Sequence, residues 1–169
     1  LIYAGRLSEE KGILDLLKVT EKLSTDIDLI IIGSGPEESK VQEVTKKFSN
    51  IHFLGYQSKE NTIKLIRGSD ILIQPSIMEG GTSSTLLEAM ACKTPIIATS
   101  VGGNKETIIH MKTAYVVTPK QPSQIFDAIN DLLNNPDKRS LLSKNAYELV
   151  SNYDWENVGK KYLEVYNGI

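Results

Sequence analysis

The alternation of two hydrophobic patterns along the chain limits its fold more than any other feature. Short, nearly all-apolar runs are separated by segments in which apolar residues recur at helical spacing. Runs of the first kind are typical of strands in a parallel sheet that is covered on both faces. The alternation therefore predicts a doubly wound α/β fold. The expected strands cover residues 1–4, 28–32, 51–53, 71–74, 95–99 and 114–117.

Helices are expected between these strands and, from Pro122 onward, without any strand between them. Two of the helices between the strands are expected near residues 59–67 and 84–91. Asp154 is a suitable N-cap for a last helix. That helix would carry on one face Trp155, Val158, Tyr162 and Tyr166. We predict one domain, residues 1–169, with a six-stranded parallel Rossmann-like sheet, helices on both faces and a helical C-terminal tail.

The charge and the cysteine content exclude several classes of protein. The 169 residues carry a formal net charge of −2, so no overall field favours nucleic acid. The single cysteine, Cys92, excludes an intrachain disulfide and a multi-cysteine zinc site. No run of roughly 18 apolar residues is present, so no transmembrane segment is expected. Because the chain opens on a strand-like run, we expect a piece of a longer cytoplasmic protein, whose remainder would make any peripheral membrane contact.

The loop after the first expected strand carries two cations, Arg6 and Lys11. Ligands of open α/β sheets bind beyond the carboxyl ends of the strands. Two cations beside the free amides of a helix N-terminus suit a phosphate or a diphosphate. The chain has only three arginines, so one at a strand end is informative. The alternative is an ordinary loop whose charges are solvated.

The second expected strand is followed by Gly-Ser-Gly-Pro at residues 33–36. This segment begins like a dinucleotide-binding fingerprint, but Glu38 stands where the third glycine would be, and no P-loop lysine follows. Gly33 and Gly35 would let the backbone approach a ligand closely. A tight turn with Pro36 at the first helical position is the alternative.

The stretch at residues 75–91, after the fourth expected strand, is the most informative. Gly80 and Gly81 permit a close backbone approach, and hydroxyls and amides at the start of the next helix suit an anion. Glu79 and Glu88 bracket this segment, and a carboxylate can accept hydrogen bonds from vicinal hydroxyls. We therefore predict a ligand with hydroxyls on both sides of a phosphate; a capped helix with a surface glutamate is the alternative. The helix-start residues are Thr82, Ser83, Ser84 and Thr85.

No metal site is expected. Asp26 and Asp28 form the most metal-like pair, but they precede a strand and therefore lie at the wrong edge of the sheet. We interpret them as turn residues. His52 and His110 have no metal-like partner at helical or hairpin spacing.

Taken together, these segments resemble the C-terminal domain of the retaining glycosyltransferases of the GT-B fold, family 4. The resemblance covers nearly the whole chain and depends on the order and spacing of several motifs. They are Gly-Arg-Leu-x-x-Glu-Lys-Gly at 5–12, Gly-x-Gly-Pro at 33–36, Leu-Gly-Tyr at 54–56, Glu-Gly to Glu-Ala-Met-Ala at 79–91, Thr-Pro-Ile-Ile-Ala at 94–98 and Val-Gly-Gly-Asn-Lys-Glu at 101–106.

The resemblance implies that the chain binds a nucleotide-diphosphate sugar such as UDP- or GDP-hexose. Arg6 and Lys11 would hold the diphosphate and stabilise the leaving group, Glu79 would contact the transferred sugar, and Glu88 would bind the ribose hydroxyls. No metal or other cofactor is implied, because cations and helix amides would neutralise the leaving group. The nucleobase would lie beside Tyr56 and Gln57. The other implied donor contacts are Gly5, Gly33, Gly35, Gly80, Gly81, Thr82, Ser83, Ser84 and Thr85.

Two positions depart from the family pattern. The family usually has seven residues between the two glutamates, whereas eight separate Glu79 from Glu88. The extra residue changes how Glu79 would reach the sugar. Lys93 stands where the family commonly has glycine, and in a left-handed backbone it would cost about 1 kcal/mol relative to glycine.

The implied activity is hexosyl transfer with retention to an acceptor glycan or glycolipid, in the synthesis of a cell-surface polysaccharide or glycolipid. The acceptor site would lie on an N-terminal domain absent from this chain, so the isolated chain would be inactive or weakly active. One alternative is an epimerase or phosphorylase of the same architecture, which would require a pyridoxal lysine or an acid-base set. The other is a non-catalytic nucleotide-sugar-binding module.

Overall fold

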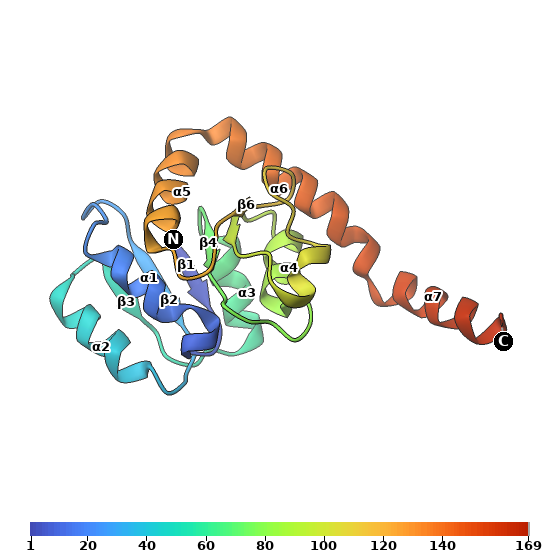
Figure 1. The fold of residues 1–169 in the computed structure, drawn as a ribbon, viewed down its shortest axis with the longest axis horizontal. Helices are drawn as coiled ribbons and strands as arrows, with labels where there is room; N and C mark the ends of the chain where they lie inside the picture. Colours follow the sequence, from blue (N-terminus) through green and yellow to red (C-terminus); the bar gives the residue numbers. More distant parts are fainter. Residues whose placement is uncertain (169) are drawn as a thin grey trace.

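A six-stranded parallel sheet forms the centre of the fold, as the sequence predicts (Figure 1). The computed structural model describes residues 1–168, without the side chains of Trp155 and Lys161. The strand order is β3-β2-β1-β4-β5-β6, which is the doubly wound order of Rossmann-like sheets. The strands are β1 (Ile2–Ala4), β2 (Leu29–Ile32), β3 (Ile51–Phe53), β4 (Leu72–Gln74), β5 (Ile96–Ala98) and β6 (Tyr115–Val116).

Helices cover both faces of the sheet. α1, α2 and α5 contribute to a hydrophobic core on one face, and α3 and α4 to a core on the other. α3 and α4 have the predicted bounds. The helices are α1 (Ile13–Thr20), α2 (Glu38–Lys47), α3 (Lys59–Arg67), α4 (Ser84–Ala91), α5 (Pro122–Asn134), α6 (Pro136–Val150) and α7 (Trp155–Asn167), with the short 3-10 helices η1 (Glu9–Lys11), η2 (Gly102–Glu106) and η3 (Ser151–Tyr153).

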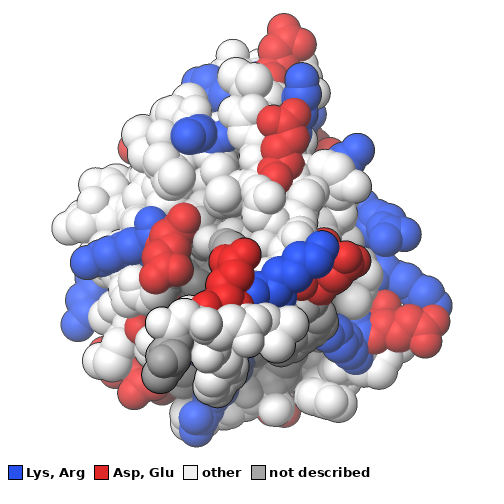
Figure 2. Space-filling model, turned by 90° about the vertical axis from the view of Figure 1, so that its right-hand side faces the viewer, with Lys and Arg blue, Asp and Glu red and all other residues white. Residues whose placement is uncertain are grey.

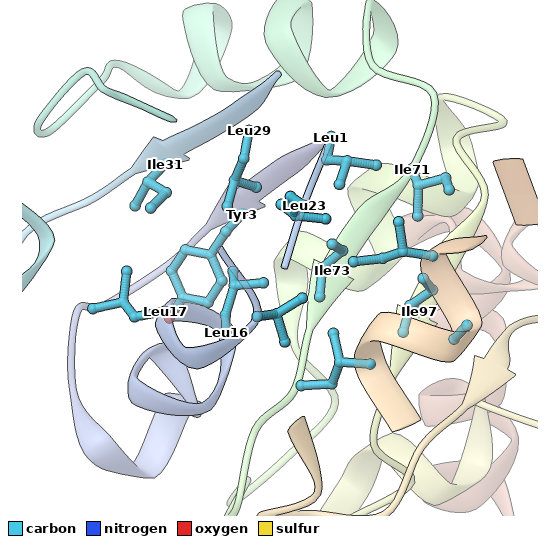
Figure 3. Close-up of a cluster of buried hydrophobic side chains, with 14 of the residues drawn as sticks. Leu1, Tyr3, Leu16, Leu17, Leu23, Leu29, Ile31, Ile71, Ile73 and Ile97 are labelled. Atoms are coloured by element: carbon cyan, nitrogen blue, oxygen red, sulfur yellow. The ribbon is translucent and has the colours of Figure 1, made fainter. Parts of the chain in front are cut away.

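Except in β3, where His52 is exposed, the two cores divide the apolar residues of each strand between them. Successive strand residues point to opposite faces of a sheet, so Tyr3 lies in the first core while Ile2 and Ala4 lie in the second. Figure 3 shows the first core, where the Tyr3 ring lies with Leu16 and Leu17 of α1. This separation explains why the strands read as continuous apolar runs in the sequence.

The direction of the chain across the sheet changes at β1. From β1 the chain passes through α1 on one face, whereas β4, on the other side of β1, leads into α4 on the opposite face. The loops after β1 and β4 therefore diverge, and open α/β sheets bind ligands in the crevice between such loops. The segments that follow β1 to β4 all meet at this carboxyl edge.

The last helix, α7, projects away from the body of the fold (Figure 1). The Asp154 carboxylate accepts a hydrogen bond from the backbone amide of Asn157 at 2.7 Å, which confirms the predicted N-cap. Tyr162 and Tyr166 are 63% and 71% exposed. The part of the predicted apolar face that falls on the Trp155 side chain lies outside the described residues.

Charged side chains of both signs are interspersed on the side of the molecule from which α7 projects. Figure 2 shows this side, with positive and negative groups next to one another and no extended field of one sign. Within residues 1–168, no helix combines the length and the apolar character that crossing a bilayer requires.

Lys93, just after α4, stands where the family commonly has glycine and has a left-handed backbone with a φ of 59°. Such a backbone costs a residue with a side chain about 1 kcal/mol relative to glycine. The Lys93 ammonium lies 4.4 Å from the centre of the Tyr147 ring on α6. A cation–π contact at an exposed site contributes about 0.5–1 kcal/mol. The contact with α6 therefore offsets much of the backbone strain.

We expect Lys93→Gly to change the free energy of unfolding by about 0.5 kcal/mol or less, because relief of strain and loss of the cation–π contact offset each other. In a Tyr147→Leu background the same substitution should stabilise by about 1 kcal/mol, since no cation–π contact remains to be lost. Urea unfolding measures both values. An equal gain in the two backgrounds would contradict this account of Lys93.

Candidate functional site

Arg6 stands in the turn directly after β1, and a buried tyrosine supports that turn. The Tyr3 hydroxyl donates a hydrogen bond to the backbone carbonyl oxygen of Arg6 at 2.8 Å. Burial raises the pKa of the Tyr3 phenol, and the negative charge of Glu79 raises it further, so the phenol keeps its proton. The Arg6 side chain is exposed at the carboxyl edge. The core thus fixes the turn that presents this guanidinium.

The glycines after β2 pack directly against the segment after β1. A Cβ at Gly33 would lie 1.8 Å from the carbonyl oxygen of Gly5, and a Cβ at Gly35 would lie 2.4 Å from that of Leu7. No side chain fits at such distances, so backbone packing requires glycine at both positions. The sequence suggested that these glycines let the backbone approach a ligand closely. In the structure, the backbone that they approach is that of the segment after β1.

A cavity of about 440 Å³ opens between these loops, the loop after β3 and the start of α4. Seven predicted site residues line it, contributed by four different loops or helix starts. Tyr56 is the most exposed of the aromatic residues of the chain's described part, at 79%. The seven residues are Gly5, Arg6, Gly33, Gly35, Tyr56, Gln57 and Thr85.

Sequence reasoning missed two polar residues of the same cavity, Ser34 and Thr62. Ser34 lies between the two glycines that the motif had indicated. Thr62 lies near the start of α3, where Ser58 is the N-cap and accepts a hydrogen bond from the backbone amide of Asn61 at 3.3 Å. The available signal was this N-cap, because α3 follows β3 and therefore begins at the carboxyl edge.

The predicted cation Lys11 and the predicted carboxylate Glu79 pair with each other. The Lys11 Nζ atom lies 2.6 Å from Glu79 Oε2, and the Ser76 hydroxyl donates to Glu79 Oε1 at 2.8 Å. The Glu79 side chain is only 5% exposed, and these two partners stabilise its buried carboxylate. Lys11 and Glu79 are not among the residues that line the 440 Å³ cavity.

The loop after β4 rests on η2. A Cβ at Gly102 would lie 1.8 Å from the carbonyl oxygen of Glu79, and a Cβ at Gly103 would lie 2.4 Å from the carbonyl carbon of Gly81. The Thr82 hydroxyl donates to the carbonyl oxygen of Gly103 at 3.0 Å. The two η2 glycines therefore allow the backbone of η2 to contact the backbone of the loop after β4. This contact fixes the position of that loop.

Gly80, Gly81 and Glu88 are three further predicted site residues. A Cβ at Gly80 or Gly81 would meet no atom within 4 Å, so packing within the described chain does not require glycine there. Glu88, on α4, is 21% exposed in its side chain, and its Oε1 atom lies 3.6 Å from the Lys59 ammonium. The structure does not bring these three residues into the lining of the cavity.

The first turn of α4 presents backbone amides at the carboxyl edge. Ser83 is the N-cap residue, but its side chain makes no hydrogen bond to the helix. Among the described residues, the amides of Ser84, Thr85 and Leu86 have no hydrogen-bond partner in the backbone. Free amides at the positive end of a helix dipole suit an anion. Thr85 brings this helix start to the same cavity as Arg6.

The acidic residue Asp28 lies away from this site, as the sequence indicated. It immediately precedes β2, so it stands at the opposite edge of the sheet. Its Oδ1 atom lies 2.8 Å from Nε2 of His52 on β3.

These features define a class of protein. A doubly wound parallel sheet whose carboxyl edge combines a guanidinium, a helix start with free amides and an exposed tyrosine belongs to the Rossmann-like α/β domains, which bind their ligands at this edge. Within that class, the chain belongs to the family described as glycosyl transferases group 1, whose model matches residues 1–149.

Individual proteins resemble the chain in sequence, in fold or in both. The lipopolysaccharide 1,2-N-acetylglucosaminetransferase of Salmonella typhimurium is 29% identical over 178 residues, which cover 97% of this chain and 47% of that protein. Anabaena Alr3699/HepE, solved in complex with UDP, has a TM-score of 0.87 at 21% identity, covering 99% of this chain and 49% of that one. The C-terminal domain of LpcC from Francisella tularensis, a group 1 glycosyl transferase, has a TM-score of 0.77 at 29% identity, covering 89% and 84%.

The chain spans about half the length of the curated relatives it matches. Its fold is one half of a GT-B fold and corresponds to the C-terminal domain, as the sequence motifs predicted.

Removal of the Lys11 ammonium should leave a buried carboxylate with one partner. We expect Lys11→Met to lower the free energy of unfolding by about 2 kcal/mol. Lys11→Met/Glu79→Gln should recover most of this loss, because the uncompensated charge is gone. Urea unfolding at neutral pH gives both values. Lys22→Met, at an exposed lysine after α1, is the control and should stay within about 0.5 kcal/mol of the wild type. A double variant less stable than Lys11→Met would contradict the pairing.

Proposed function

We propose that this chain is the donor-binding half of a glycosyltransferase that moves a hexosyl group from a nucleotide-diphosphate sugar to an acceptor with retention. The observation that supports this most directly is that Arg6 and the uncapped start of α4 meet in one cavity. A diphosphate requires cationic groups and N–H donors, and this cavity offers both. Membership of the glycosyl transferase group 1 family supports the same activity.

The nucleoside end of the donor lies, in this proposal, on the side of the cavity formed by the loop after β3. The exposed Tyr56 ring offers a stacking surface for a nucleobase, and the Gln57 side chain lies beside it. Glu88 accepts hydrogen bonds from the ribose hydroxyls. Its ion pair with Lys59 is 3.6 Å long, and Lys59 is 79% exposed, so the Glu88 carboxylate remains free to accept them.

The phosphate end lies at Arg6 and the first turn of α4. These groups stabilise the negative charge that develops on the leaving diphosphate, and each such contact contributes a few kcal/mol in a transition state. Lys11 has three N–H donors, of which one is taken by Glu79, so it can also bind a phosphate oxygen. The cations and the helix amides together do the work of a metal ion, and the mechanism we propose uses none.

The sugar end lies beside the loop after β4. Gly80 and Gly81 leave open space where a side chain would otherwise project. Their backbone groups and the Thr82 and Ser83 region contact the sugar and its phosphate in this proposal. Glu79, held at both oxygens by Lys11 and Ser76, provides a fixed carboxylate at the base of that loop.

The acceptor belongs to the other half of the parent protein. Because the chain spans about half the length of its relatives, we infer a second, N-terminal domain that binds a glycan or glycolipid. The lipopolysaccharide in the name of the Salmonella relative supports an acceptor at the cell surface. The exposed apolar side chains of α7 suit a contact with that domain. They are Tyr162, Leu163, Val165 and Tyr166.

Calorimetric titration of the 169-residue chain with UDP, GDP and ADP tests the donor site. We expect binding of at least one of them, and little or no sugar transfer by this half alone. Arg6→Ala and Lys11→Ala should each weaken that nucleoside diphosphate by about tenfold, the effect of losing one charge-assisted hydrogen bond. Both variants should leave binding of the matching nucleoside within about twofold, because neither residue contacts the base or the ribose.

The matched control is Arg67→Ala. Arg67 is exposed at the end of α3, at the opposite edge of the sheet, and its loss changes the net charge as Arg6→Ala does. It should leave both affinities unchanged. No detectable binding of any of the three nucleotides would overturn the proposed function. Equal losses for diphosphate and nucleoside would overturn the phosphate role of Arg6 and Lys11.

A further inference from the structure

Ser83 occupies the N-cap position of α4, where a serine hydroxyl ordinarily accepts a hydrogen bond from the first helical turn. Here the hydroxyl is directed elsewhere: it accepts a hydrogen bond from Nε2 of Gln74 at 2.8 Å, and it makes no bond to the helix. The residue type that best closes a helix N-terminus is therefore present at α4 but does not close it.

Gln74 is held rigidly where it reaches this hydroxyl. It is the last residue of β4, pairs in register with Ala98 of β5 and is 3% exposed. It is also the one polar residue of that strand. Its Oε1 atom is buried and has no hydrogen-bond partner among the described residues. A buried polar group of this kind is costly to fold, so its contact with Ser83 needs a reason beyond packing.

Asn104 holds the other side of Ser83. Its Oδ1 atom accepts a hydrogen bond from the Ser83 backbone amide at 3.0 Å. Asn104 belongs to η2 and is fully buried, and its Nδ2 atom has no partner among residues 1–168. Two buried carboxamides from outside α4 therefore fix Ser83 at its backbone and at its hydroxyl.

We infer that Gln74 and Asn104 are positioning residues that keep the Ser83 hydroxyl off α4, so that the amides of Ser84, Thr85 and Leu86 stay open to a phosphate of the donor. This inference rests on the proposed function and deepens it. A capping hydroxyl would compete with the phosphate for the same amides, because each N–H has one proton to donate. The site thus gives up a stabilising cap in order to keep its anion-binding turn available.

Substitution of Gln74 should weaken nucleotide binding and at the same time stabilise the first turn of α4. In Gln74→Met, a side chain of similar length lacks the amide, so the Ser83 hydroxyl is free to cap α4. The nucleoside diphosphate that the wild-type chain binds best among UDP, GDP and ADP should bind about three- to tenfold more weakly, as expected when an ordinary N-cap bond must be broken first. Amide exchange at Thr85 or Leu86, measured without nucleotide, should become slower.

Removal of the hydroxyl provides the rescue. Ser83→Ala has no group to cap the helix and leaves the first-turn amides open, so it gives the reference affinity of a site without this hydroxyl. Gln74→Met/Ser83→Ala should match Ser83→Ala within about twofold and bind more tightly than Gln74→Met, although it lacks both side chains of the contact. A purely structural role of Gln74 predicts the reverse, with the double variant at least as impaired as Gln74→Met.

Thr20→Val is the control for loss of a buried hydrogen bond elsewhere. Its hydroxyl donates to the carbonyl oxygen of Leu17 at 2.7 Å at the far end of α1, so its loss should not change nucleotide affinity. Circular dichroism verifies that each variant is folded, and Gln74→Leu replaces Gln74→Met if the latter is not. If the wild-type chain binds the nucleotide, the proposed function stands. The inference about Gln74 and Asn104 would then be overturned by unchanged affinity in Gln74→Met, or by a Gln74→Met/Ser83→Ala variant that binds no more tightly than Gln74→Met. Absence of wild-type binding would overturn both.

Discussion

The position of the first turn of α4 is the constraint on which the rest of the site depends. The Gly102 backbone lies against that of Glu79, the Asn104 carboxamide holds the Ser83 amide, and Gln74 holds the Ser83 hydroxyl. Gln74 ends β4 and η2 follows β5, and β4 and β5 are neighbours in the sheet. The strand order therefore brings these groups together at one edge, and the close backbone contacts of Gly102 and Gly103 fix the position of η2 relative to the loop after β4.

The two cations of the β1 segment have different surroundings and so different uses. Arg6 is exposed on a turn that the buried Tyr3 supports, and it lines the cavity. Lys11 is 29% exposed in its side chain and is paired with the buried Glu79. Arg6 is therefore available to an anion, whereas Lys11 also pairs with a buried carboxylate. Loss of Arg6 should affect binding alone, and loss of Lys11 should affect binding and folding together.

The order of strands and helices could be predicted because burial leaves a local record in the sequence. The apolar runs and the helical spacing gave the sheet, and α3 and α4 have the predicted bounds. The Lys11–Glu79 pair, 68 positions apart, and the contacts of Gln74 and Asn104 leave no such local record, because they depend on which loops the sheet brings together. The assignment of the whole chain to one domain and the ligand roles of the site residues remain predictions.

The proposed donor site requires a nucleotide's phosphates to lie between Arg6 and the first turn of α4. A crystal structure of this chain with the nucleoside diphosphate that it binds best tests this directly. We expect phosphate oxygens within about 3 Å of the Arg6 guanidinium and of the first-turn amides of α4, with the base beside Tyr56 and the Ser83 hydroxyl still on Gln74. Phosphates bound away from α4, for example in the cavity between Ile109 and Leu149, would contradict it.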